Sequence, residues 1–201
     1  MSSAGEGKEG WPVELTGVTE SVVSTLGPND RWNFAALGLF AGEPVTARTW
    51  GNTRTRRNFH GRGEGYVQFT RDPVAFVEAA CSIHEREEPV LPAADAWVRV
   101  EAEHVGSGES GGTQWEEWAL RPVESVVENR VVPTTSRGYS AVIEGTVAAS
   151  RLDVESYDTG ALLDRLAYFE GVVERCGGER EREAFSRLSE HTGWTHRNES
   201  F

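Results

Sequence analysis

The first 70 residues alternate between short apolar runs and turn sequences, which is the pattern of an antiparallel sheet. Gly27-Pro28-Asn29-Asp30 and Gly42-Glu43-Pro44 are strong turn signals, because these residue types favour turn conformations. The runs between the turns are rich in β-branched and aromatic residues, which favour strands. The pattern predicts four strands, over residues 18–26, 32–41, 45–50 and 66–70.

The middle of the chain returns to the strand pattern after one helix. Asp72-Pro73 predicts a helix start, with the aspartate as N-cap and the proline in the first turn, and we expect this helix to end at about Glu85. An acidic, proline-bearing loop is expected from there to residue 95. Alternating positions then predict three more strands, over residues 96–105, 114–127 and 139–150. Strands at this spacing predict a closed antiparallel barrel with one helix in the barrel region, and therefore an α+β fold.

The C-terminal quarter has a helical period instead. Asp158 is the expected N-cap of a helix over 159–176 and Gly177 its end, and a second helix is expected over 179–190. The apolar face of the first helix comprises Leu162, Leu163, Leu166, Phe169, Val172 and Val173. We expect these two helices to form a hairpin on the barrel or on a partner subunit. The predicted segments are a disordered tail over 1–15, the barrel over 16–152, the helical hairpin over 153–193 and a tail over 194–201.

The composition indicates a habitat and argues against one class of partner. Thirty-two acidic residues against twenty basic ones give a formal net charge of −12, and Lys8 is the only lysine. Such a surface resembles that of proteins from salt-loving archaea, because high ionic strength screens its self-repulsion. It argues against a nucleic acid as partner, since a nucleic-acid reader normally presents a basic face. We expect no membrane partner and a cytoplasmic location, because no apolar run could span a bilayer and the N-terminus lacks the features of a signal peptide.

The sequence TWGNTRTRRNF, residues 49–59, is a dense cluster of hydroxyl, guanidinium and amide donors. It holds three threonines, three arginines and two asparagines between two predicted strands. We expect it to form a loop, where guanidinium forks, hydroxyls and backbone N–H groups can hold a phosphate. The alternative is a solvated, arginine-rich hairpin whose charges pair with acids elsewhere.

Three segments in order resemble a known family. VTESVVSTLGPNDRWNFAALGL, GNTRTRRNF and VQFTRDPVAF resemble the FMN-binding split barrels of the flavin reductase-like superfamily. More narrowly, these segments, RGYSAVIEGTVAASRL and the two-helix tail resemble an archaeal family called domain of unknown function 447. The resemblance runs from about Val18 to about Leu188.

The resemblance implies FMN as cofactor and a set of binding residues. The positions that match the phosphate-gripping loop of such barrels are Thr53, Arg54, Thr55 and Asn58. A strand with an asparagine followed by small residues is implied to lie against the flat isoalloxazine ring, and Asn33, Ala35 and Ala36 match it. Such barrels are usually homodimers with the flavin near the interface, where Arg137 of the loop before the last predicted strand could reach the flavin.

The remaining candidates for chemistry are weak. The five histidines show no metal-ligand spacing, so no metal site is expected, and no catalytic residue is assigned. Three functions stay open: an FMN-dependent oxidoreductase, a flavin-binding carrier or sensor without catalysis, and a barrel that binds the deazaflavin F420. The sequence names no electron donor or acceptor.

Overall fold

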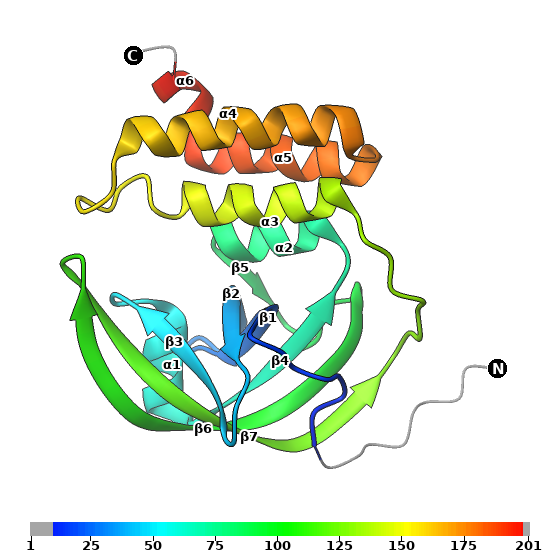
Figure 1. The fold of residues 1–201 in the computed structure, drawn as a ribbon. Coiled ribbons are helices and arrows are strands. Elements are labelled where there is room, and N and C mark those ends of the chain that lie inside the picture. The colour runs from blue at the N-terminus through cyan, green and yellow to red at the C-terminus, as the bar shows by residue number, and fades with distance from the viewer. Residues whose placement is uncertain (1–9, 199–201) are drawn as a thin grey trace. The chain divides into compact units, whose positions relative to one another are not determined.

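The computed structural model describes residues 10–198, which form two compact units. The barrel unit comprises residues 10–71 and 84–131, and the helical unit comprises residues 72–83 and 132–198. Figure 1 shows the helices and strands of both units. No helix among the described residues has the length and apolar character needed to cross a bilayer.

The barrel unit is a closed, six-stranded antiparallel barrel with a seventh strand at one edge. Going round the barrel the strand order is β1, β4, β6, β7, β3 and β2, and β2 pairs again with β1. The short strand β5 pairs with β2 and with no other described strand. The strands are β1 (Val18–Leu26), β2 (Trp32–Phe40), β3 (Val45–Trp50), β4 (Glu64–Thr70), β5 (His84–Arg86), β6 (Ala94–Ser110) and β7 (Thr113–Val127). The split-barrel fold and the α+β class predicted from the sequence are therefore confirmed.

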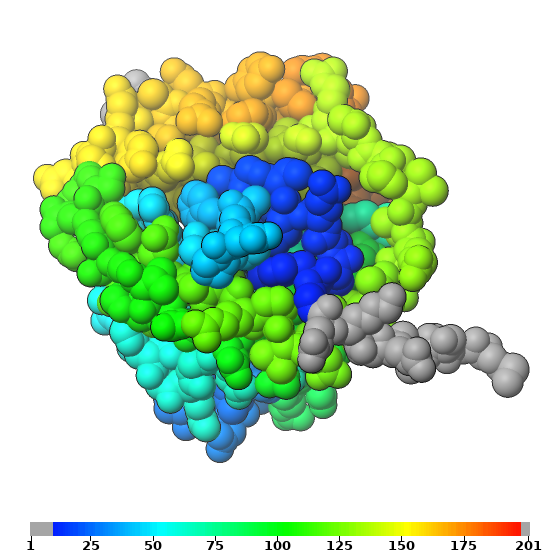
Figure 2. All heavy atoms as spheres, turned by 60° about the horizontal axis from the view of Figure 1, so that its bottom comes forward, coloured from blue at the N-terminus to red at the C-terminus, as the bar shows by residue number. Residues whose placement is uncertain are grey.

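The barrel core is built by alternate residues of each strand. Val23 of β1, Leu37 of β2, Val67 of β4 and Trp118 of β7 lie in one buried cluster, as the period of two in strands requires. Trp11 packs against the same cluster, although it lies in the segment that was expected to be a disordered tail; residues 1–9 of that segment lie outside the described residues. In Figure 2 the long β6–β7 hairpin (green) lies beside the β2–β3 segment (light blue), in agreement with the pairing of β3 and β7.

The donor-rich stretch is a helix rather than the predicted loop. Helix α1 (Arg54–Arg62) is capped by Thr53, whose hydroxyl accepts a hydrogen bond from the Arg56 N–H at 3.3 Å. It ends at Gly63, whose φ of 66° is the left-handed conformation that favours glycine. Three buried residues at helical spacing stabilise it: Thr55, Asn58 and Phe59. The loop prediction gave weight to the polar composition and overlooked this spacing.

The helical unit contains a buried core of its own. It comprises α2 (Pro73–Cys81), α3 (Arg137–Ala149), α4 (Thr159–Cys176), α5 (Glu179–Thr192) and α6 (Trp194–Asn198). Asp72 and Asp158 cap α2 and α4 as predicted, while α2 ends at Cys81 rather than near Glu85. The apolar face of α4 packs in this core with residues of α2, α3, α5 and α6, among them Phe185 and Trp194. The segment expected to be a C-terminal tail thus begins with a helix whose first residue is buried.

The predicted last strand, 139–150, is wrong, because this segment is helix α3. Its buried residues recur every three or four positions and are mostly small: Gly138, Ala141, Val142, Gly145, Thr146, Ala148 and Ala149. A side chain at position 145 would place its Cβ 2.7 Å from the Phe185 ring, so glycine allows α3 and α5 to approach closely. Helix α3 belongs to the helical unit, so the boundary between the two units near residue 131 differs from the expected one at 152.

Candidate functional site

The first turn of α1 presents unused hydrogen-bond donors. Thr53 caps the N–H of Arg56, whereas the N–H groups of Arg54 and Thr55 precede the first intrahelical bonds. The first turn holds no acidic residue, and Arg54 is its first member. A helix N-terminus with an arginine and no carboxylate in its first turn favours an anion.

Two polar side chains near this turn make no hydrogen bond within the described residues, and in Thr55 the polar atom itself is buried. The Thr55 hydroxyl is buried, and no hydrogen bond reaches it within the described part of the chain. Over the same residues no hydrogen bond reaches the Asn33 amide, although Asn33 is only 6% exposed. Asn58, one turn beyond Thr55, donates to the hydroxyl of Thr25 at 3.0 Å, and Thr25 is the register partner of Asn33. Helix α1 and the β1–β2 ladder thus bring these side chains to one place. Because buried polar groups normally have partners, this place fits a polar ligand.

Strand β2 has a free backbone edge beside them. Strand β1 pairs with β2 along its whole length, from Trp32 to Phe40. On the opposite edge β5 covers residues 32–34 and β3 covers residues 39–40. No described strand pairs with residues 35–38 on that edge, so alternate backbone N–H and C=O groups there are left for another partner. Ala35 and Ala36 lie in this gap, where their small side chains leave the backbone accessible to a flat group.

Arg54 already has an anionic partner in the structure. Its Nη1 donates to a carboxylate oxygen of Glu85 in β5, the register partner of Asn33. Sequence reasoning missed both this strand and this carboxylate, because β5 has only three residues and all of them are polar.

A second carboxylate that sequence reasoning missed holds α1 against β7. Glu116 is 7% exposed and accepts hydrogen bonds from Arg56 at 2.5 Å and from the His60 ring nitrogen at 2.7 Å. Burial raises the pKa of Glu116, but the hydrogen bonds from Arg56 and His60 outweigh it and leave the pKa below its ordinary value. Because His60 and Glu116 are 56 positions apart, no local motif indicated the pair. This cluster fixes the orientation of α1 on the barrel.

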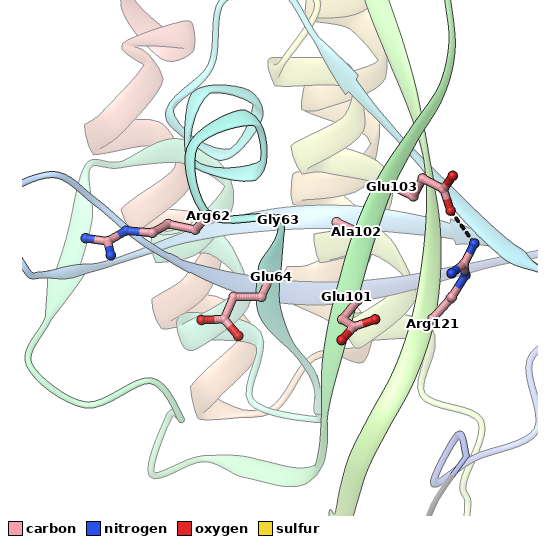
Figure 3. Close-up of a pocket in the computed structure, with 7 residues that line it drawn as sticks. All are labelled: Arg62, Gly63, Glu64, Glu101, Ala102, Glu103 and Arg121. Atoms are coloured by element: carbon pink, nitrogen blue, oxygen red, sulfur yellow. Dashed lines mark hydrogen bonds and ion pairs between the residues drawn. The ribbon is translucent and has the colours of Figure 1, made fainter.

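A cavity of about 380 Å³ lies at the opposite end of α1 (Figure 3). It is lined by Arg62, Gly63, Glu64, Glu101, Ala102, Glu103 and Arg121. Arg121 is hydrogen-bonded to Glu103, and Arg62 points away from that pair. Three carboxylates against two arginines make this cavity a poor site for a phosphate, and it contains none of the residues predicted from the sequence.

Of the predicted residues, two groups lie on neighbouring elements of the barrel unit, and one residue belongs to the helical unit. Thr53, Arg54, Thr55 and Asn58 lie at the start and along one side of α1, and Asn33, Ala35 and Ala36 lie on β2. Arg137 is the first residue of α3 in the helical unit. Its part in a flavin site stays a prediction.

Comparison with solved structures finds several proteins that are similar to this chain. An FMN-bound protein of the DUF447 family from Methanosarcina mazei is similar over 88% of this chain and 96% of its own, with 24% identity and a TM-score of 0.74. Component B of nitrilotriacetate monooxygenase from Bacillus cereus is similar over 60% of this chain and 74% of its own, with 16% identity and a TM-score of 0.43. Flavoredoxin from Methanosarcina acetivorans is similar over 63% and 79%, with 10% identity and a TM-score of 0.41.

Family models match both parts of the chain. The model described as protein of unknown function (DUF447) N-terminal domain matches residues 19–129, and the model described as protein of unknown function (DUF447) matches residues 136–190. The first match alone covers more than half of the chain. The chain therefore belongs to the DUF447 family, as its sequence resemblance indicated.

Proposed function

We propose that the barrel unit binds FMN and that the protein exchanges electrons or a hydride through it. The observation that carries the proposal is the Thr55 hydroxyl, a buried polar group in the first turn of α1 for which the described residues supply no hydrogen-bond partner. The FMN-bound relative of the same family and fold supports the choice of FMN.

The first turn of α1 would hold the phosphate. Arg54 and the free N–H groups of the turn supply positive charge and donors, and the Thr53 hydroxyl keeps a proton to donate because it acts as an acceptor in the cap. The Thr55 hydroxyl gains a partner that the protein alone does not give it. Asn58 serves differently: its amide is bound to Thr25, so it positions α1 rather than contacting the ligand.

The free edge of β2 would lie beside the isoalloxazine ring. One edge of that ring carries amide-like donors and acceptors, which match the unpaired backbone groups of residues 35–38. The Asn33 amide can add a side-chain hydrogen bond there. When bound, FMN itself supplies the redox chemistry. The part of Asn33, Ala35 and Ala36 is to bind and orient the ring and to exclude water from it, and we assign no proton transfer to a side chain of this chain.

Titration with FMN and with riboflavin, which lacks the phosphate, tests the phosphate site. We expect the wild type to bind FMN more tightly than riboflavin. Arg54→Ala should weaken FMN binding about 10–100-fold, the equivalent of one charge-assisted hydrogen bond, and leave riboflavin binding unchanged. Arg62→Ala, at the opposite end of the same helix and 48% exposed, is the matched control and should bind both as the wild type does. An equal loss of affinity for both flavins in Arg54→Ala would show that Arg54 does not contact the phosphate.

Two further measurements separate the proposed oxidoreductase from the alternatives. Mass spectrometry of the copurified ligand distinguishes FMN from the deazaflavin F420. Rapid mixing with NADH or NADPH then tests the redox role, because bleaching of bound flavin is expected of an oxidoreductase. A protein that binds FMN and is reduced by neither nicotinamide under anaerobic conditions would favour a carrier or sensor.

A homodimer, with Arg137 of one subunit near the flavin, remains part of the proposal. The apolar face of α4 gives it no support, because Leu162, Leu166 and Val173 are buried within the helical unit itself. Sedimentation in molar salt tests the dimer, and a monomer at micromolar concentration would remove it. Loss of FMN affinity in Arg137→Ala would support the role of Arg137.

A further inference from the structure

Glu85 is paired with the guanidinium group of Arg54, the group that we assign to binding of the flavin phosphate. Its carboxylate accepts a hydrogen bond from Nη1 of Arg54. Arg54 contacts no other acceptor within residues 10–198, so its remaining N–H donors are available to a ligand. Position 85 is also the register partner of Asn33, which places this carboxylate at the candidate site and not beyond it.

The carboxylate of Glu85 is held in place from the β1–β2 turn. Asn29 donates its side-chain amide to the second carboxylate oxygen at 3.2 Å, and Arg31 donates to the Glu85 backbone carbonyl at 3.4 Å. The turn that presents these two residues is defined by Asp30, whose φ of 54° is rare for a residue other than glycine. The Glu85 side chain is only 21% exposed. A carboxylate held from two sides cannot move far away when a second anion reaches Arg54.

We propose that Glu85 is a specificity-determining residue that competes with the flavin phosphate for Arg54. It thereby sets how strongly the site distinguishes FMN from riboflavin and keeps bound FMN exchangeable. The inference rests on the proposed function, because it requires the phosphate to lie at Arg54.

The negative charge of Glu85 determines whether this residue strengthens or weakens the binding of FMN. A phosphate monoester carries a charge of about −1.5 to −2 at pH 7, so binding would bring two anions to one guanidinium. Their repulsion weakens the binding of FMN and leaves uncharged riboflavin unaffected. Glu85 also orients Arg54, and that contribution acts in the opposite direction. The substitution Glu85→Gln retains a side-chain oxygen that accepts from Arg54, so it removes the repulsion and largely preserves the orientation.

The experiment measures the dissociation constants of FMN and riboflavin for the wild type, Glu85→Gln and Glu87→Gln by fluorescence titration of the full chain. Glu87 is the matched control: it lies two residues away, is 85% exposed and pairs with Arg31 rather than Arg54. Both variants remove one negative charge. A difference in FMN affinity between them therefore reports where the charge lies and not the net charge of the protein. We expect Glu85→Gln to bind FMN about tenfold more tightly and riboflavin as the wild type does, while Glu87→Gln changes neither affinity by more than about threefold.

Weaker or unchanged FMN binding in Glu85→Gln would overturn the inference, because orientation of Arg54 would then be the main role of Glu85. An equal gain in Glu87→Gln would overturn it too, since net charge alone would explain the result. If Glu85→Gln did not fold by circular dichroism, Glu85→Ala would take its place with the same expected direction and a smaller gain. The proposed function fails separately, when the wild type does not prefer FMN to riboflavin.

Discussion

Asn58 donates a hydrogen bond from its side-chain amide to the hydroxyl of Thr25 at 3.0 Å, and this bond joins the middle of α1 to the end of β1. Both residues are buried, and they are 33 positions apart in the chain. Because Thr25 lies opposite Asn33 in the β1–β2 ladder, the bond holds the helix that carries Arg54 and Thr55 against the strand that carries Asn33. This contact therefore joins α1 to the β1–β2 ladder, while the bonds of Arg56 and His60 to Glu116 hold the same helix to β7.

Asn58→Leu should reduce the free energy of unfolding by about 1–3 kcal/mol, because the Thr25 hydroxyl is left buried without its donor. Thr25→Val combined with Asn58→Leu should restore part of this loss, since no polar group then lacks a partner. Urea unfolding followed by circular dichroism measures both. Strictly additive losses in the double variant would show that the two side chains are not energetically coupled.

Thr55→Val should have opposite effects on stability and on binding. Valine has nearly the shape of threonine, and the hydroxyl that it replaces is buried without a partner, so the free protein should become about 1 kcal/mol more stable. If the hydroxyl is kept for a ligand, FMN affinity should fall by about tenfold. Thermal unfolding without flavin and a titration with FMN measure the two effects. A less stable variant with unchanged affinity would show that the hydroxyl has an ordered-water partner and no role at the site.

Two glycines in helices should respond to alanine in opposite directions. The Cβ of alanine at position 145 would lie 2.7 Å from a ring carbon of Phe185, which is 3% exposed and cannot move aside, so Gly145→Ala should cost about 1–3 kcal/mol. A Cβ at position 61, inside α1, meets nothing within 4 Å, so Gly61→Ala should stabilise by about 0.5–1 kcal/mol. Urea unfolding of the two variants checks this pair. Equal destabilisation would mean that the conformation of Gly61, rather than space, is what matters.

The period of the apolar residues allowed most of the barrel to be predicted from the sequence. Strands β1 and β3 and helix α4 have the predicted bounds, because each begins and ends at a clear signal such as the Asp158 cap or Gly177. Helix α3 was misread as a strand because its β-branched residues, such as Val142 and Thr146, favour strands locally. Its helical period is carried by small residues whose role depends on close packing with α5, which no local propensity encodes.

The candidate site was predictable only in part, for a related reason. The donors of α1 are consecutive in the sequence and could be recognised as a group. Their carboxylate partners could not: Glu85 and Glu116 lie 31 and 60 positions away from Arg54 and Arg56, on strands whose pairing brings them back. The free edge of β2 likewise follows from where β3 and β5 stop pairing, and a strand's own sequence does not reveal which of its edges is covered.

The acid excess predicts that salt stabilises the protein. A formal charge of −12 on 201 residues produces repulsion across the surface, and ions screen it. The midpoint of thermal unfolding should rise by several degrees as potassium chloride is raised from dilute buffer to molar concentration. Surface ion pairs such as Arg121–Glu103 act in the opposite direction, because screening weakens them. A falling midpoint would show that such pairs outweigh the net repulsion, and the halophilic interpretation would be wrong.

The Glu116 cluster predicts how stability depends on acid. The pKa of this carboxyl lies below its ordinary value of 4.5. Burial raises the pKa, but the hydrogen bonds from Arg56 and His60 lower it by more than burial raises it. A depressed pKa means that the ionised form stabilises the folded state; this contribution is present above about pH 4.5 and is lost as the pH falls through the lower, folded pKa.

Glu116→Gln should therefore reduce the free energy of unfolding by about 1.5–3 kcal/mol at pH 7. Its deficit relative to the wild type should shrink as the pH falls below about 4.5, because the wild-type carboxyl becomes neutral as well. Urea unfolding from neutral to acidic pH measures this. Glu117→Gln is the matched control, since the neighbouring carboxylate pairs with Arg48 at 2.9 Å and is more exposed, and its deficit should be smaller at every pH. A deficit of Glu116→Gln that did not change with pH would show that packing of the side chain, and not its charge, holds α1 to β7.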